Sequence, residues 1–176
     1  VMAAFAAAVK IDAFAYMPLQ DFGNAFSTFI AQNYGAGRKD RIRKGIRSAT
    51  LTSVLFALAV SAIVVICAKP LLLIFVHVQE TQILEVGMSY LRVVGAFYCG
   101  IGILFLLYGL YRAISRPAVS LVLTIISLGT RVALAYLLSA IPAIGVTGIW
   151  WAVPIGWFLA DAAGIAWYAL KYKNRM

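Results

Sequence analysis

Charged residues are scarce in this chain of 176 residues, where Asp, Glu, Lys and Arg together make up 12% of the sequence. A soluble domain carries roughly 25%. Apolar residues make up 64%, whereas soluble domains contain roughly 45–50% and disordered chains contain fewer. These proportions exclude a soluble domain and a disordered chain, and they predict an integral membrane protein.

Metal-binding and nucleophilic side chains are scarce too. The chain has one histidine, His77, and two cysteines, Cys67 and Cys99, each within an apolar run. No set of His, Cys and carboxylate residues has the spacing of metal ligands, so no metal site is predicted. No Ser/His/Asp set, Gly-rich phosphate loop or pair of carboxylates at fixed spacing indicates an enzyme. We therefore expect neither catalysis nor a cofactor.

Long uncharged runs take up most of the chain. Two of them, at 48–68 and 93–111, are 21 and 19 residues long and lie between basic residues. Both lengths match the roughly 20 residues that cross the hydrocarbon core of a bilayer. The predicted fold class is all-α, an integral membrane protein with five transmembrane helices, approximately at 12–34, 48–68, 92–112, 118–138 and 148–170. Links are expected at 37–47, 70–83, 112–117 and 141–148.

Basic residues are unevenly divided between the two sides of the predicted bundle. Eleven Lys and Arg fall in the basic loop 37–47, the third link and the C-terminal tail, against Lys10, Lys69 and Arg92 on the other side. The positive-inside rule therefore places loop 37–47 and the C-terminus in the cytoplasm of a multi-pass protein of the cell membrane. Binding of anionic headgroups by this loop is an alternative role. Nucleic acid is not an expected partner, because these cations do not cover a folded polar face.

The first predicted helix carries polar side chains at membrane depth, where they are costly and often functional. At 100° per residue, five of them fall within an arc of about 120°: Gln20, Asp21, Asn24, Ser27 and Thr28. Pro18 predicts a kink in the outer half of this helix, and Tyr16 lies nearby. We predict that this polar stripe lines a substrate cavity. The alternative is a hydrogen-bonded seam between helices.

Two further charges, Arg131 and Asp161, fall inside the fourth and fifth predicted helices. Their expected depths differ by roughly 9 Å, so a direct ion pair is not favoured, and each is a candidate for a role in transport. Asp12, at the outer end of the first helix, is expected at headgroup depth. Glycines of the third helix are expected at close helix contacts or bends: Gly95, Gly100, Gly102 and Gly109.

A resemblance to a known family begins at residues 13–45, which read AFAYMPLQDFGNAFSTFIAQNYGAGRKDRIRKG. This segment resembles a signature of the multidrug and toxin extrusion (MATE) transporters: a Pro-containing helix, a small polar centre, Gln-Asn-x-Gly-Ala-Gly and a basic loop. Three later stretches resemble the same family in the same order. They are LLLIFV followed by Tyr-Leu-Arg, then SLGTRVALAYLLS, and finally IGVTGIWWAVPIGW.

The resemblance implies that residues 1–176 form a partial C-terminal bundle, helices eight to twelve, of a twelve-helix, two-bundle antiporter. Residues 1–9 would belong to the end of helix seven and its outer link. The N-terminal bundle and most of helix seven would be missing and would be the partner of this half. The implied function is export of small, amphipathic, cationic organic compounds across the lipid bilayer by alternating access.

The coupling ion implied by the family is H⁺ or Na⁺. One branch carries its coupling carboxylates on helices seven and ten, but residues 86–111 contain no Asp or Glu. The other branch uses an Asp on the first helix, which this chain would lack. Two alternatives to a multidrug antiporter stay open: a lipid-linked sugar flippase of the same superfamily, with Lys10 and Arg131 for phosphate, and a structural membrane subunit that transports nothing.

Overall fold

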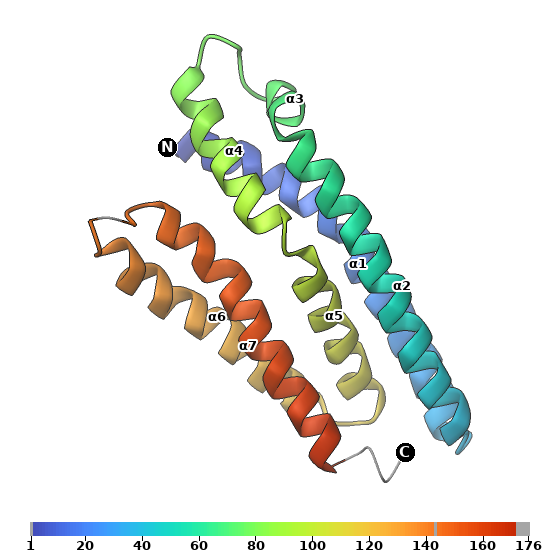
Figure 1. Cartoon of the computed structure of the whole chain (residues 1–176). Helices are drawn as coiled ribbons and strands as arrows, with labels where there is room; N and C mark the ends of the chain where they lie inside the picture. Colours follow the sequence, from blue (N-terminus) through green and yellow to red (C-terminus); the bar gives the residue numbers. More distant parts are fainter. Residues whose placement is uncertain (1, 143, 172–176) are drawn as a thin grey trace.

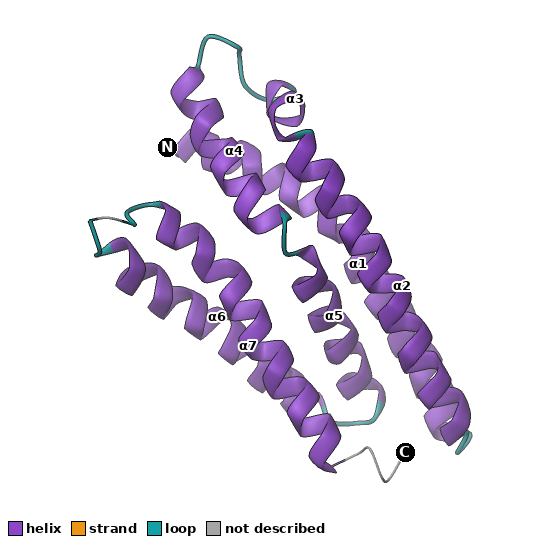
Figure 2. Ribbon diagram, in the orientation of Figure 1, coloured by secondary structure: helices purple, strands orange, loops and turns teal. Residues whose placement is uncertain are grey.

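The computed structural model describes residues 2–142 and 144–171, and within them every regular element is a helix (Figures 1 and 2). The helices are α1 Met2–Gly35, α2 Lys39–Ile66, α3 Ala68–Leu73, α4 Thr81–Gly95, α5 Tyr98–Ala113, α6 Pro117–Ser139 and α7 Thr147–Lys171. The prediction of an all-α fold is confirmed. The bounds of α6 and α7 agree with the predicted helices to within one residue.

Helix α5 is the centre of the bundle, because it contacts α1, α2, α6 and α7. Its glycines allow these close approaches. A Cβ on Gly109 would lie 2.6 Å from the carbonyl oxygen of Gly23 on α1, and one on Gly102 would lie 2.8 Å from the Ser53 hydroxyl on α2. The expected close helix contacts are therefore present. Helices α6 and α7 form an antiparallel hairpin beside α5 (Figure 1).

Helix α1 differs from its predicted bounds. It begins at Met2 instead of residue 12 and continues without a break to Gly35. Residues 1–9 were expected to hold the end of a preceding helix and its outer link, but residues 2–9 are part of the same helix as the polar stripe. The sequence from 2 to 13 contains six alanines and no Gly or Pro, so nothing in it ends a helix. Val1 lies outside the described residues.

The helix expected at 92–112 is also longer, and it is broken. Helices α4 and α5 meet at an angle of 52° across Ala96 and Phe97. At the break, the Phe97 amide donates to the Val94 carbonyl at 3.1 Å. Gly95 lies at this bend, with Val64 of α2 so close that a Cβ would lie 3.0 Å from Val64 Cγ1. Gly95 is therefore both a close contact and a bending point.

The link expected at 70–83 is shorter than predicted, because α3 takes up its start and α4 begins at Thr81. The basic loop expected at 37–47 is also mostly helical, since α2 begins at Lys39. Arg and Lys are good helix formers. Asp40 lies in the first turn of α2, where a carboxylate interacts favourably with the positive end of the helix.

Helices α2, α6 and α7 are each long and apolar enough to cross a membrane, and α4 with α5 meets the same requirements as one bent span. These are four of the five predicted spans. Helix α1 has 34 residues, enough for about 51 Å. Its polar side chains lower its hydropathy, so α1 is not among the helices that meet both requirements. Large apolar side chains such as Leu55, Leu121 and Ile125 are exposed, as expected of residues that face lipid.

Candidate functional site

The polar stripe lies on a face of α1 that the rest of the described chain leaves open. Helix α1 buries the opposite face through Leu19, Phe26 and Ile30. The stripe divides into exposed and half-buried positions. Gln20, Asp21, Asn24 and Thr28 are exposed, and Ser27 is half-buried. The stripe is thus free to meet a ligand or another part of the transporter, and the described residues do not distinguish these two roles.

Pro18 lies inside α1 and does not end it. Because proline has no backbone N–H, the helix lacks one hydrogen bond at this point. Tyr16, two residues earlier, is half-buried and stacks at a tilt against Phe105 of α5, with ring centroids 6.1 Å apart. Phe105 in turn contacts Tyr108 at 6.4 Å. A row of three aromatic rings therefore runs from α1 onto α5 beside the stripe.

Arg112 joins the stripe from α5. Its Nη2 donates a hydrogen bond of 2.9 Å to Asn24 Oδ1, and its Nε donates to the Tyr108 carbonyl at 3.3 Å. The close approach of α1 and α5 at Gly23 and Gly109 brings the two helices near enough for this contact. Sequence reasoning placed Arg112 only at the end of a span. Its contact with Asn24 depends on residues 88 positions apart, which no local pattern reveals.

Asp12, which was expected at the outer end of its helix, is buried in the bundle. Its side chain is 6% exposed. Asp12 Oδ1 accepts a hydrogen bond from the Tyr98 hydroxyl at 2.7 Å, and Oδ2 accepts one from the Tyr90 hydroxyl at 3.0 Å. The position expected at the end of the helix was wrong because α1 begins ten residues earlier than predicted, so Asp12 lies about 15 Å from the start of the helix. Tyr90 precedes the α4–α5 break and Tyr98 follows it.

Aromatic rings hold Tyr90 in place. The Tyr90 and Trp150 rings make an edge contact at 5.1 Å between centroids, and Phe5 of α1 makes an edge contact with Tyr90 at 5.6 Å. Phe5 also stacks on Trp150 of α7 at 5.6 Å. The Asp12 carboxylate is therefore coordinated by two hydroxyls whose positions depend on α1, α4, α5 and α7. We refer to Asp12, Tyr90 and Tyr98 as the carboxylate cluster.

Asp161 and Arg131 lie on facing helices but do not form an ion pair in the described part of the chain. Asp161 is 4% exposed, and neither of its carboxylate oxygens has a hydrogen-bond partner. The Nε of Arg131 is also buried without a partner. The Arg131 guanidinium carbon lies 6.0 Å from the centre of the Trp157 ring. Burying a carboxylate without a partner is costly, which makes Asp161 a candidate for a role in transport.

The described residues contain no group of three or more His, Cys, Asp or Glu side chains that could hold a metal ion. They define a helical membrane bundle with an open polar face, a buried carboxylate cluster and one unpaired buried carboxylate. Residues 1–137 match the family model described as MatE. The chain belongs to the MatE family, as the resemblance of its motifs implied.

Similar proteins agree with this assignment. A probable multidrug resistance protein NorM of Thermotoga maritima is 24% identical over 143 residues, which are 81% of this chain and 30% of that protein. A solved MOP superfamily transporter from Pyrococcus furiosus is 22% identical to this chain, with a TM-score of 0.88. The match covers 96% of this chain and 38% of that transporter chain. The chain therefore spans about a third of the proteins it matches.

Two further solved structures are of multidrug resistance MATE family transporters. One, in an outward-facing conformation, is 22% identical to this chain, with a TM-score of 0.89. The match covers 96% of this chain and 38% of that transporter chain. The other, in an inward-facing conformation, is 21% identical to this chain, with a TM-score of 0.87. The match covers 96% of this chain and 39% of that transporter chain. At these identities the likeness shows the fold, a part of a MATE bundle. Because the family's proteins are transporters, the expectation that the chain is no enzyme agrees with its membership.

Proposed function

We propose that this chain is part of a cation-coupled efflux transporter that exports small, amphipathic, cationic organic compounds by alternating access. The observation that carries this proposal is the open polar face of α1, a helix of 34 residues whose other face is buried. A lipid-facing helix does not keep a carboxylate and two amides on its surface, because they would be desolvated at high cost. A water-filled cavity or a second bundle satisfies them.

The chemistry of this face suits an organic cation. The exposed carboxylate of Asp21 supplies negative charge, and the neighbouring row of Tyr16, Phe105 and Tyr108 supplies aromatic faces. Aromatic rings and a carboxylate together favour a cation with an apolar body. Arg112 donates a hydrogen bond to Asn24 and orients that amide. The side chains proposed to contact substrate are Tyr16, Gln20, Asp21, Asn24, Ser27 and Thr28.

Alternating access is supported by the comparison with two conformations of the related transporters. The bundle matches an outward-facing structure with a TM-score of 0.89 and an inward-facing one with a TM-score of 0.87. A helical unit that fits both states almost equally well keeps its internal fold while its orientation changes. We infer that the present bundle moves as a rigid body against another bundle, with the stripe between the two.

The carboxylate cluster is the proposed site where the coupling ion acts. Asp12 receives hydrogen bonds from residues on both sides of the α4–α5 break. Binding of H⁺ or Na⁺ to its carboxylate would change the acceptor that Tyr90 and Tyr98 share, and so would alter how α4 and α5 are held against α1. A ligand shifts a conformational equilibrium only if it binds the two states differently. The proposal therefore requires that the cluster bind the ion more tightly in one state than in the other.

The orientation in the membrane is proposed from the arrangement of charge. The α1–α2 turn, the α5–α6 loop and the end of α7 lie at one end of the bundle (Figure 1). This end carries Arg38 to Arg47, Arg112, Arg116 and Lys171, whereas Lys69 and Arg92 lie on α3 and α4, toward the other end. We propose that the basic end faces the cytoplasm. The C-terminal tail beyond Lys171, which was part of the sequence argument, lies outside the described residues.

A transport assay tests this function. The full-length gene product is reconstituted in proteoliposomes, and uptake of ethidium, a fluorescent organic cation, is followed under an imposed H⁺ or Na⁺ gradient. One gradient is expected to drive uptake, and Asp12→Asn is expected to remove that dependence. Glu85→Gln, which also replaces a carboxylate with an amide but at an exposed site on α4, is the control. Absence of uptake under either gradient would favour the structural subunit, and movement of a lipid-linked sugar would favour the flippase.

A further inference from the structure

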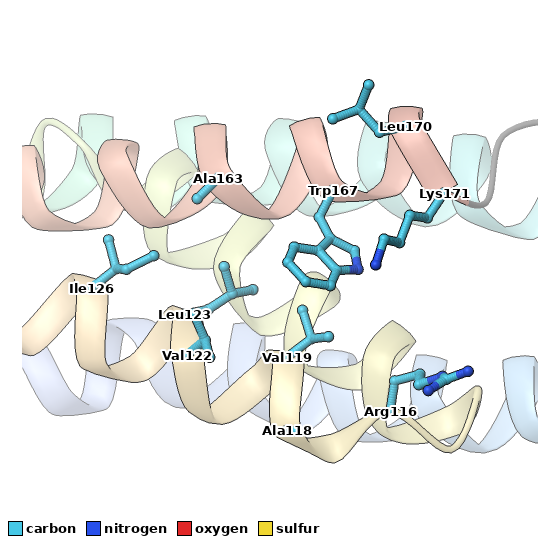
Figure 3. A pocket seen from close by; sticks show the side chains of 10 residues that line it. All are labelled: Arg116, Ala118, Val119, Val122, Leu123, Ile126, Ala163, Trp167, Leu170 and Lys171. Atoms are coloured by element: carbon cyan, nitrogen blue, oxygen red, sulfur yellow. The ribbon is translucent and has the colours of Figure 1, made fainter.

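A groove of about 680 Å³ runs between the first half of α6 and the last turns of α7. Most of its lining is apolar, with Val119, Leu123 and Ile126 from α6 and Ala163 from α7. Two cations, Arg116 and Lys171, lie at one end of it. Figure 3 shows both side chains at the same end, with the apolar side chains following one another away from them. The groove is therefore amphipathic along its length.

The turn between α5 and α6 places Arg116, and Lys171 lies against an aromatic ring. Arg116 is the N-cap residue of α6, directly before Pro117, and its side chain makes no capping hydrogen bond. Its amide donates to the Tyr111 carbonyl at 2.8 Å, and Ser115 before it adopts a left-handed φ of 58°, an arrangement that ends α5 sharply. Lys171 Nζ lies 4.5 Å from the centre of the Trp167 ring on the preceding turn of α7. No carboxylate in the described ranges forms an ion pair with either cation.

The dimensions of the groove match one leaflet of a bilayer. Ile126 follows Arg116 by ten residues of α6, a rise of about 15 Å, which is half of the roughly 30 Å hydrocarbon core. The groove opens beside exposed apolar side chains, Val122 at 48% and Leu170 at 86%. Tryptophan and long cationic side chains at one end are typical of the headgroup region. The groove thus presents cations at headgroup depth and an apolar channel below them.

We propose that this groove binds an anionic phospholipid of the leaflet at the basic end of the bundle. The phosphate lies between Arg116 and Lys171, where the positive end of the α6 helix dipole also favours an anion. One acyl chain follows Val119, Leu123 and Ile126 toward the membrane centre. The site is separate from the polar stripe of α1, so the proposal stands whether or not the stripe binds substrate.

Native mass spectrometry of the purified full-length protein tests the proposal. The protein is mixed with phosphatidylglycerol or phosphatidylcholine in a mild detergent, and bound lipids are counted. One phosphatidylglycerol is expected to remain bound in preference to phosphatidylcholine. Arg116→Gln combined with Lys171→Gln is expected to weaken the binding of phosphatidylglycerol about thirtyfold, because two charged contacts at the membrane surface are lost.

A matched control removes the same charge elsewhere on the same end, with Arg41→Gln and Lys44→Gln on α2, which should leave this lipid bound. Val122→Trp keeps both cations but fills the groove from an exposed position, and it should also displace the lipid. An equal loss in the control pair, or equal retention of the two lipids, would overturn the proposal. So would the absence of any retained lipid, which would indicate that another helix of the transporter occupies the groove.

Discussion

The hydroxyl of Tyr98, the first residue of α5, donates a 2.7 Å hydrogen bond to the buried carboxylate of Asp12 on α1. Tyr90, on the other side of the α4–α5 break, donates to the second oxygen of the same carboxylate. One side chain of α1 thereby holds both halves of a bent span. This contact links α1, which carries the polar stripe further along, to the 52° break between α4 and α5.

Tyr98→Phe is expected to destabilise the bundle by about 1–3 kcal/mol, because it removes a hydrogen bond to a buried carboxylate. Loss of thermal stability, followed by circular dichroism of the purified protein, measures the effect. Tyr136→Phe, at an exposed position on α6, is the control. Equal melting temperatures for the two variants would show that the Asp12 contact contributes nothing to the fold.

Gly109→Ala is expected to destabilise the contact between α1 and α5 by about 1–3 kcal/mol, because its Cβ would collide with the Gly23 carbonyl. The same change at Gly129, in the middle of α6, meets nothing within 4 Å. Gly129→Ala should stabilise by up to about 1 kcal/mol, since Ala is the better helix former. Thermal melts of the two variants, compared with the parent, should therefore shift in opposite directions. Shifts in the same direction would contradict the close approach of the two helices.

Asp161→Leu is expected to raise the melting temperature of the bundle, because the buried carboxylate has no partner among the described residues. A buried polar group without a partner costs about 1–3 kcal/mol, which an apolar side chain at this position would recover. If Asp161 also has a role in transport, the stabilised variant loses ethidium uptake. Glu85→Gln, at an exposed site on α4, serves as the control for loss of a carboxylate. A lower melting temperature for Asp161→Leu would mean that a partner outside the described residues satisfies this carboxylate.

Single cysteines at Lys39 and Gln79, in a background without Cys67 and Cys99, test the orientation. Both positions are exposed, and they lie at opposite ends of the bundle. In intact cells, an impermeant thiol reagent should label the cysteine at position 79 and leave that at position 39 unmodified. Labelling of position 39 from outside would reverse the proposed topology.

Hydropathy predicts the helices of this fold wherever apolar runs end at Pro, Gly or a cation. Helices α6 and α7 match their predicted bounds for that reason. The same method misses the start of α4, because Gln82, Glu85 and Arg92 give it the composition of a loop. It also misses the start of α1, because Lys10 and Asp12 interrupt the apolar run and have the composition expected at the end of a span.

The candidate site is predictable only in part, and the missing part is long-range. The helical period places Gln20, Asp21 and Asn24 on one face, and the structure leaves that face open. The partners of Asp12 lie 78 and 86 residues away on helices whose bend is a tertiary feature. Local pattern therefore finds the polar face but not the buried carboxylate cluster.

The most direct test of the central claim, that the polar stripe of α1 contacts substrate, is equilibrium binding of ethidium to the purified full-length protein by fluorescence anisotropy. Asn24→Ala and Gln20→Ala should each raise the dissociation constant of ethidium about three- to tenfold, because each removes one hydrogen bond to the substrate. Ser61→Ala on α2 should leave it unchanged, since the buried Ser61 hydroxyl has no partner in the described residues. Unchanged affinity with a lower folded yield for the two α1 variants would contradict the claim and identify the stripe as a seam between helices.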